Sequence, residues 1–201
     1  MVAAPDLRSR LLAALEVSGA ASSDFDLNPD EAPQNRREFA PAAALVGVIP
    51  APAGARLILT KRSSSLKHHP GQIAFPGGKV DVGDANAADA ALREAHEEIG
   101  LEPSRADVLG ELPIHETVSG FAVAPVLALI DRGFVPIPEP EEVDEAFDVP
   151  LDHVTDPARF SIQSRRWRGR RRRYYAVPYG PYYIWGATAR ILRGLAERMA
   201  S

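Results

Sequence analysis

The most informative segment of the chain reads Arg93-Glu94-Ala95-His96-Glu97-Glu98-Ile99-Gly100-Leu101. On an α-helix, Glu94, Glu97 and Glu98 are spaced i, i+3 and i+4, so their side chains share one face. Carboxylates this close repel one another unless a cation lies among them. Mg²⁺, Mn²⁺ and Ca²⁺ all prefer oxygen ligands of this kind. The segment therefore predicts a divalent-metal site and chemistry on a phosphate compound.

The neighbouring residues predict where this helix begins, ends and packs. Asp84 and Asn86 are both good N-caps, and Gly100 is typical of the residue that follows a helix. The glutamates centre about 120° away from an apolar stripe, which puts them at the edge of a cleft beside the core. Arg93 lies four residues before Glu97 and can pair with it. A solvated acidic face is the alternative interpretation of the helix alone. The apolar stripe consists of Ala88, Ala91, Leu92, Ala95 and Ile99.

A glycine pair just upstream favours the metal interpretation. The sequence there is Phe75-Pro76-Gly77-Gly78-Lys79-Val80-Asp81. Paired glycines let a backbone turn sharply and approach a ligand closely. The carbonyl of Gly78 can then complete the oxygen shell of a metal ion.

Together these segments resemble the Nudix box, which runs Gly, five residues, Glu, seven residues, Arg-Glu, an apolar residue, any residue, Glu-Glu, any residue, Gly and an apolar residue. The interval from Gly78 to Arg93 is one residue longer than the usual spacing, and we take Asp84 as the equivalent of the first glutamate. The resemblance implies the α/β (α+β) Nudix fold, an α/β/α sandwich in which helices flank a mixed sheet and the box forms a loop-helix-loop. The residues that match in kind are Gly78, Arg93, Glu94, Ala95, Glu97, Glu98, Gly100 and Leu101.

The resemblance also implies roles in a metal-dependent hydrolase. Bound Mg²⁺ or Mn²⁺ would polarise a phosphoryl oxygen and lower the pKa of metal-bound water. The expected metal ligands are Glu94, Glu97, Glu98 and the Gly78 carbonyl. The expected catalytic residues are Arg93, Glu94, Glu97 and Glu142. Glu142 is the candidate for a further carboxylate from a later loop, with Glu141 as second choice, although residues 139–145 also fit a solvated acidic loop.

A second segment points to one subfamily. Residues 59–78 read LTKRSSSLKHHPGQIAFPGG and resemble the extended signature of coenzyme A pyrophosphatases. Weaker matches follow in order at residues 117–121, 142–150 and 184–189. The resemblance implies hydrolysis of coenzyme A or acyl-CoA to 3′,5′-ADP and 4′-phosphopantetheine or its acyl derivative. The expected substrate-binding residues are Arg62, Lys67, His69 and Gln72.

Two other functions remain open from the sequence. The first is a Nudix hydrolase that acts on ADP-ribose, NADH or a dinucleoside polyphosphate. The second is a regulator that keeps the fold and binds a nucleotide or RNA without hydrolysis. The intact set of Glu94, Glu97 and Glu98 disfavours the regulator, and residues 59–78 favour coenzyme A over other substrates.

Residues 165–173 read RRWRGRRRR and form the densest basic run. Arginine binds phosphates by paired hydrogen bonds, so the run can contact the 3′-phosphate of coenzyme A. Arginines beside Trp167 can also bind RNA by charge and stacking. We favour a third interpretation, a solvated β-hairpin with Gly169 near its tip.

Composition and length fit one enzyme domain with a short extension. The chain has 201 residues, 45% of them hydrophobic, and a formal charge of −4, which gives no general attraction to nucleic acid. It has no cysteine, which fits a cytoplasmic protein, and no apolar run long enough to span a membrane. We expect an N-terminal helix and linker over residues 1–38 and a Nudix domain over residues 39–199.

Periodicity predicts the remaining elements. An amphipathic helix over residues 7–17 is expected to lie on the domain or a partner, and residues 18–37 to form a linker or surface arm. A closing helix is expected over residues 187–199. Tyr182, Tyr183 and Trp185 suggest core packing or a homodimer surface. The expected strands are residues 42–49, 55–60, 108–112, 121–130, 159–163 and 174–179.

Overall fold

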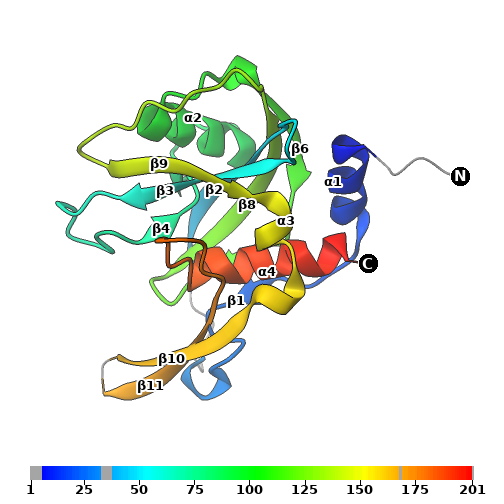
Figure 1. The fold of residues 1–201 in the computed structure, drawn as a ribbon. Helices are drawn as coiled ribbons and strands as arrows, with labels where there is room; N and C mark the ends of the chain where they lie inside the picture. Colours follow the sequence, from blue (N-terminus) through cyan, green and yellow to red (C-terminus); the bar gives the residue numbers. More distant parts are fainter. Residues whose placement is uncertain (1–5, 33–37, 168, 201) are drawn as a thin grey trace, which may run out of the picture.

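The computed structural model describes residues 6–32, 38–167 and 169–200 (Figure 1). The helices are α1 (Leu7–Glu16), α2 (Ala87–Ile99), α3 (Leu151–Val154) and α4 (Ala187–Met199), with short 3₁₀ turns η1 (Pro29–Glu31), η2 (Pro103–Arg105) and η3 (Pro157–Arg159). The strands are β1 (Ser22–Ser23), β2 (Ala40–Ile49), β3 (Arg56–Arg62), β4 (Ile73–Ala74), β5 (Gly77–Lys79), β6 (Ala106–Glu111), β7 (His115–Glu116), β8 (Phe121–Ile130), β9 (Val143–Pro150), β10 (Ser161–Trp167) and β11 (Arg170–Ala176).

A mixed sheet forms the middle layer. Its strand order is β1-β7-β8-β2-β3-β4, and β5 also pairs with β2, β6 with β8 and β9 with β3. β2 and β8 run parallel over a long register, from Ala40 opposite Phe121 to Val48 opposite Leu129. Both strands are strongly apolar, because helices bury both faces of the sheet at this point.

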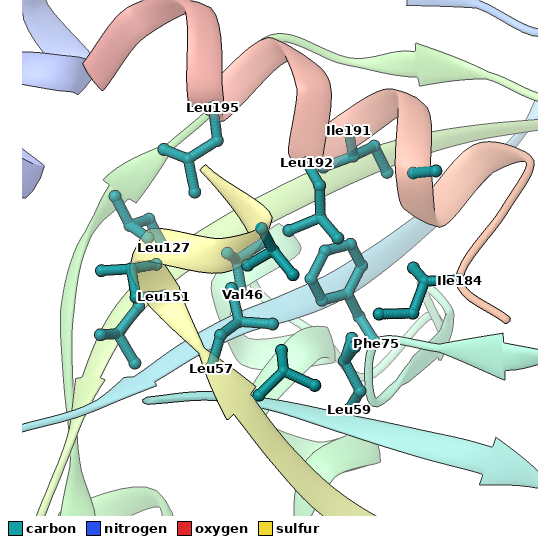
Figure 2. Packing of buried hydrophobic residues seen from close by; sticks show 14 of the residues in the cluster. Val46, Leu57, Leu59, Phe75, Leu127, Leu151, Ile184, Ile191, Leu192 and Leu195 are labelled. Atoms are coloured by element: carbon teal, nitrogen blue, oxygen red, sulfur yellow. The ribbon is translucent and has the colours of Figure 1, made fainter. Parts of the chain in front are cut away.

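Helices cover the two faces, as the α/β/α prediction required (Figure 1). On one face, α2 packs Ala91, Ala95 and Ile99 into a core that includes Ile58 and Val126. The other core is closed by α1, α3 and α4. Figure 2 shows side chains of α4 and α3 meeting those of the strands there, and the residues labelled are Val46, Leu57, Leu59, Phe75, Leu127, Leu151, Ile184, Ile191, Leu192 and Leu195.

The caps of α2 explain its bounds. The Asn86 side chain accepts a hydrogen bond from the Asp89 N–H at 2.9 Å, which satisfies one of the free donors of the first turn. Gly100 ends the helix with φ of 67°, a left-handed conformation that favours glycine. Of the two predicted N-caps, the structure therefore selects Asn86, and the predicted end at Gly100 is confirmed.

Several strand bounds differ from those predicted. The fifth predicted strand begins later, at Ser161, because Pro157–Arg159 forms a 3₁₀ turn, and the sixth runs over Arg170–Ala176 instead of 174–179. The acidic segment after Glu142 is strand β9, which pairs antiparallel with β3. Sequence patterns did not reveal β9, because three consecutive middle residues are partly buried between two exposed aspartates, without a clean apolar period of two.

The N-terminal segment lies on the domain. α1 buries Leu11 and Ala14 against α4 and β6, as the amphipathic pattern indicated. The stretch that follows, residues 18–32, is called the N-terminal arm below. Ser22 and Ser23 pair in parallel with His115 and Glu116, so the arm is a surface arm fixed to the sheet edge.

Candidate active site

The glutamate helix packs directly against the glycine pair. The Gly77 N–H donates a hydrogen bond to Glu98 Oε2 at 3.3 Å. A Cβ atom at position 78 would lie 2.4 Å from the Glu94 carboxyl group, so a side chain there would displace this carboxylate. β5 reaches this position because it pairs with β2, where Gly77 lies opposite Ala44. The glycine backbone therefore closely approaches two carboxylates of α2, whereas the sequence predicted that it approaches a ligand.

Burial controls the protonation of these carboxylates. Glu98 is only 4% exposed, and removal from water raises its pKa to about 8, helped by the nearby charges of Glu94 and Glu142. Burial also raises the pKa of Glu94, although a hydrogen bond from Arg93 opposes the shift. The arrangement thus places carboxyl groups where water solvates their charged forms poorly.

Arg93 organises the entrance of the site. Its Nε and Nη2 atoms each lie 3.0 Å from a carboxylate oxygen of Asp84, in a paired contact that lowers the pKa of Asp84 and raises that of Arg93. Nη1 donates to Glu94 at 3.0 Å and to Glu97 at 3.3 Å, which confirms the expected i,i+4 pair. Nη2 also donates to the Lys79 carbonyl at 3.0 Å, which ties α2 to the glycine loop.

The donor set fits a hard divalent cation. Glu94, Glu97 and Glu98 supply carboxylate oxygens, and the Gly77-Gly78 backbone lies against two of them. Within the described ranges, no three acidic or histidine side chains already converge closely enough to hold a metal ion. Arg93 spans two of the carboxylates, and Glu97 is 52% exposed, so completing a metal shell requires side-chain rotation at Glu94 and Glu97.

Glu142 lies at the same site. The charge of its carboxylate raises the pKa values of both Glu94 and Glu98. Glu142 lies just before β9 and is therefore distant from α2 in the sequence. Its carbonyl accepts a hydrogen bond from the Ser63 N–H at 2.8 Å, which holds this segment beside the end of β3. The structure therefore brings together the later carboxylate and the helix carboxylates.

A large cavity extends from this site. Its volume is about 750 Å³, and Gly77, Gly78 and Lys79 form part of its lining. Three of the four predicted substrate-binding residues, Arg62, His69 and Gln72, line it, whereas Lys67 is exposed and lies outside the lining. The charge of Arg62 also acts on Glu98 and favours its ionised form, so this arginine joins the cavity to the carboxylates.

The far wall of the cavity contains Tyr174 and Trp185, which sequence reasoning did not assign to the site, and Arg165, for which phosphate binding was an alternative to the favoured solvated hairpin. Arg165 and Tyr174 of the β10–β11 hairpin line it together with Trp185. We expected a solvated hairpin and a Trp185 in the core or at a dimer surface. The hairpin and the left-handed Gly169 near its tip are confirmed, but one face of the hairpin borders the cavity. Arg168 and the side chain of Trp167 lie outside the described residues.

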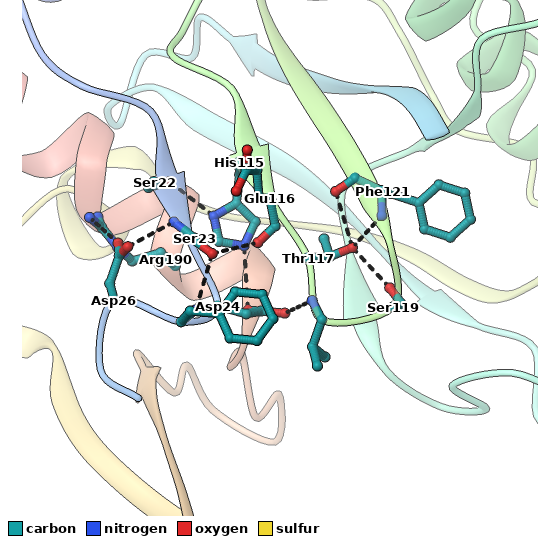
Figure 3. Close-up of polar contacts among 12 residues, drawn as sticks. Ser22, Ser23, Asp24, Asp26, His115, Glu116, Thr117, Ser119, Phe121 and Arg190 are labelled. Atoms are coloured by element: carbon teal, nitrogen blue, oxygen red, sulfur yellow. Dashed lines mark hydrogen bonds and ion pairs between the residues drawn. The ribbon is translucent and has the colours of Figure 1, made fainter. Parts of the chain in front are cut away.

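The N-terminal arm completes this wall through a polar network (Figure 3). His115 is fully buried, with Nδ1 2.9 Å from Ser22 Oγ and Nε2 3.4 Å from Asp24 Oδ1. Asp24 also accepts the Val118 N–H at 2.9 Å. Burial alone would raise the pKa of Asp24, but its contacts with His115 and Val118 outweigh burial and lower it. Asp26 pairs with Arg190 of α4 at 2.8 Å, which anchors the arm on a second side.

Comparison with known proteins places this geometry in a family. A family model described as "NUDIX domain" matches residues 40–169, more than half of the chain. The chain belongs to the Nudix family. This match contains the glycine pair, α2 and Glu142, and it ends inside the β10–β11 hairpin.

Named relatives agree with this membership. A protein of Enterobacter sp. (strain 638) called "Uncharacterized Nudix hydrolase NudL" is 42% identical over 70% of this chain and 73% of its own length. A protein of the same name from Escherichia coli (strain K12) is 40% identical over 77% of this chain and 80% of its own length. The chain is therefore a Nudix pyrophosphohydrolase.

A solved structure supports the fold. The chain resembles a MutT/nudix family protein from Enterococcus faecalis with a TM-score of 0.50 and 14% identity, over 99% of this chain and 76% of that one. At this identity the likeness extends to the fold alone. None of the helices in the described ranges is long and apolar enough to cross a membrane.

The Asp24 contacts predict an acid-sensitive anchor for the arm. Because folding lowers the pKa of Asp24, its carboxylate stabilises the protein above its unfolded pKa near 3.8, and this contribution is lost as the pH falls through the lower folded value. Asp24→Asn should therefore lower the free energy of unfolding by about 1–3 kcal/mol at neutral pH. The difference from the wild type should shrink below about pH 4.

Urea unfolding at a series of pH values measures this difference. Asp30→Asn, an exposed position on the same arm, is the matched control and should follow the wild-type curve throughout. A constant gap between the Asp24→Asn and wild-type curves from neutral to acid pH would contradict the assignment.

Proposed function

We propose that the protein hydrolyses the diphosphate bond of coenzyme A or acyl-CoA, giving 3′,5′-ADP and 4′-phosphopantetheine or its acyl derivative. One observation carries the proposal. The segment that resembles the coenzyme A pyrophosphatase signature, residues 59–78, lines the cavity through Arg62, His69 and Gln72, and also through Gly77 and Gly78, against which the carboxylates of α2 pack. A volume of about 750 Å³ is ample for a nucleotide-sized ligand.

Nudix hydrolases generally use divalent cations such as Mg²⁺ or Mn²⁺. In this proposal Glu94, Glu97, Glu98 and the Gly78 carbonyl hold the cation. A bound cation supplies charge neutralisation on the diphosphate oxygens and a more acidic water. The support from this chain is the buried, oxygen-rich character of the site and the raised pKa of Glu98, which signals a carboxylate short of positive charge.

The protein residues then position the groups that react. Hydrolysis forms one bond from a water oxygen to phosphorus and breaks the bridging P–O bond, while a proton leaves the water. We assign Glu142 as the acceptor of this proton, because its carboxylate is exposed and close enough to act electrostatically on Glu94 and Glu98. Arg93 donates one hydrogen bond to Glu94 and is itself held by its hydrogen bond to Asp84. It is therefore a positioning residue in this scheme.

Glu142→Gln tests the later carboxylate. The substitution removes the proton acceptor at nearly constant volume, so kcat at saturating metal should fall by about 10²-fold. Glu141→Gln is the matched control, since Glu141 is the exposed neighbour on the same loop, and its kcat should stay at the wild-type value. Equal kcat values for Glu142→Gln and the wild type would remove Glu142 from the reaction.

A substrate panel tests the reaction itself. Coenzyme A, 3′-dephospho-CoA, ADP-ribose and NADH are each incubated with the enzyme and Mg²⁺ or Mn²⁺, and the products are separated by chromatography. We expect the highest kcat/KM for coenzyme A, with 3′,5′-ADP among the products. Faster turnover of ADP-ribose or NADH would assign the enzyme to another nucleoside diphosphate derivative, and binding without turnover of any of them would support a regulator.

A further inference from the structure

The cavity has a second end that lies outside the segment shared with the Nudix family. The shared segment covers residues 40–169, yet the lining also includes Ser23 and Asp24 of the arm, Tyr174 of β11, and Trp185. The arm is fixed there by the Asp24–His115 contact and by two hydrogen bonds between Asn28 and the backbone of Arg173. This end of the cavity is therefore formed largely by parts of the chain outside the family match, together with Arg165 near the end of that match.

Arg165 is held in a defined position on this wall. Its guanidinium carbon lies 4.3 Å from the centre of the Trp185 ring, within the range of a cation–π contact. Tyr174 packs edge-on against the same indole, with ring centres 5.0 Å apart and planes at 61°. A guanidinium stacked on a ring face keeps its N–H groups at its edge, where they remain available to an anion.

Hairpin register explains why Arg165 faces the cavity. Arg165 lies opposite Arg172, and Gln163 lies opposite Tyr174, so these four side chains share one face of the hairpin. The next residue, Arg166, lies opposite Arg171 and belongs to the other face. Strand alternation thus places Arg165 and Arg166 on opposite faces of the hairpin, and of these two residues only Arg165 lines the cavity.

Two of the other arginines that line the cavity on this side have carboxylate partners. Arg172 contacts Glu31 at 3.2 Å, and Arg190 contacts Asp26 at 2.8 Å. No carboxylate lies within ion-pair distance of Arg165 in the part of the chain that the structure describes. The wall consequently carries a positive charge that its own acidic residues leave unmatched.

The loop that carries the coenzyme A signature adjoins this wall. The Gln72 amide nitrogen lies 3.8 Å from the position that a Cβ atom would take on Gly186, the residue after Trp185. The Thr188 hydroxyl donates to the Ile73 carbonyl at 3.0 Å and fastens the start of α4 to the same loop. One ligand in the cavity can therefore meet residues 59–78 and the Arg165–Trp185 pair together.

We propose that Arg165, stacked on Trp185, forms an anion subsite for a phosphate monoester on the part of the substrate beyond the scissile diphosphate. The proposal rests on the proposed function, in which that group is the 3′-phosphate of coenzyme A. The edge of the guanidinium binds the phosphate oxygens by charge-assisted hydrogen bonds. Trp185 and Tyr174 fix the orientation of the guanidinium and do not contact the reacting atoms.

Binding of two reaction-independent probes tests the subsite. We would measure the dissociation constants of 3′,5′-ADP and 5′-AMP by calorimetry, since the two ligands differ only in the 3′-phosphate. The wild type should bind 3′,5′-ADP at least about ten-fold more tightly. Arg165→Gln should abolish this preference, and Arg165→Lys, which keeps the charge but loses the planar fork, should restore part of it.

Arg166→Gln is the matched control, because it removes the same charge from the adjacent position on the solvent face of the hairpin. It should keep the wild-type preference. Equal affinities of the wild type for the two ligands would overturn the proposal, as would a preference that survives Arg165→Gln or an equal loss for both ligands in that variant.

The binding result is separable from the reaction. If coenzyme A is not hydrolysed but the preference for 3′,5′-ADP depends on Arg165, the subsite stands and the proposed reaction is wrong. If coenzyme A is hydrolysed and the preference does not depend on Arg165, the reaction stands and the subsite is wrong.

Discussion

The contact between the buried carboxylates of α2 and the Gly77-Gly78 backbone is the constraint on which the site depends. An ionised Glu98 at 4% exposure has lost most of its water and receives one backbone hydrogen bond from Gly77 in return. Such a group is stable as an anion only if a cation approaches it. The same contact sets the packing of α2 on β2, because β5 must lie between them without side chains at positions 77 and 78.

Local patterns revealed the elements whose residues carry a clear period or cap. α2 and α4 have apolar stripes at helical spacing and were predicted almost residue for residue, and the Arg93–Glu97 pair follows from spacing alone. The depth of Glu98 was not predictable, because it depends on β5 and on the segment around Glu142, which are distant in sequence. The sequence predicted that the glutamates lie at the edge of a cleft. This position fits the exposed Glu97 better than the buried Glu98.

The cavity wall shows a different limit of sequence reasoning. Residues 165–173 look uniformly basic, and only the strand register separates Arg165 from Arg166. From the sequence, residues 18–37 fitted a linker as well as a surface arm, because the anchors of the arm, His115 and Arg190, come from far along the chain. The shared Nudix segment thus supplies the carboxylates and part of the cavity, while segments on either side of it complete the wall that a substrate meets.

The most direct test of the account is a Mn²⁺ titration followed by electron paramagnetic resonance, which counts the free ion. We predict saturable binding by the wild type, binding at least about ten-fold weaker in Glu98→Gln, and unchanged binding in Glu111→Gln, an exposed glutamate on β6. Equal Mn²⁺ affinity in Glu98→Gln and the wild type, or no binding by the wild type, would contradict the claim that the buried carboxylates of α2 exist to hold a divalent cation.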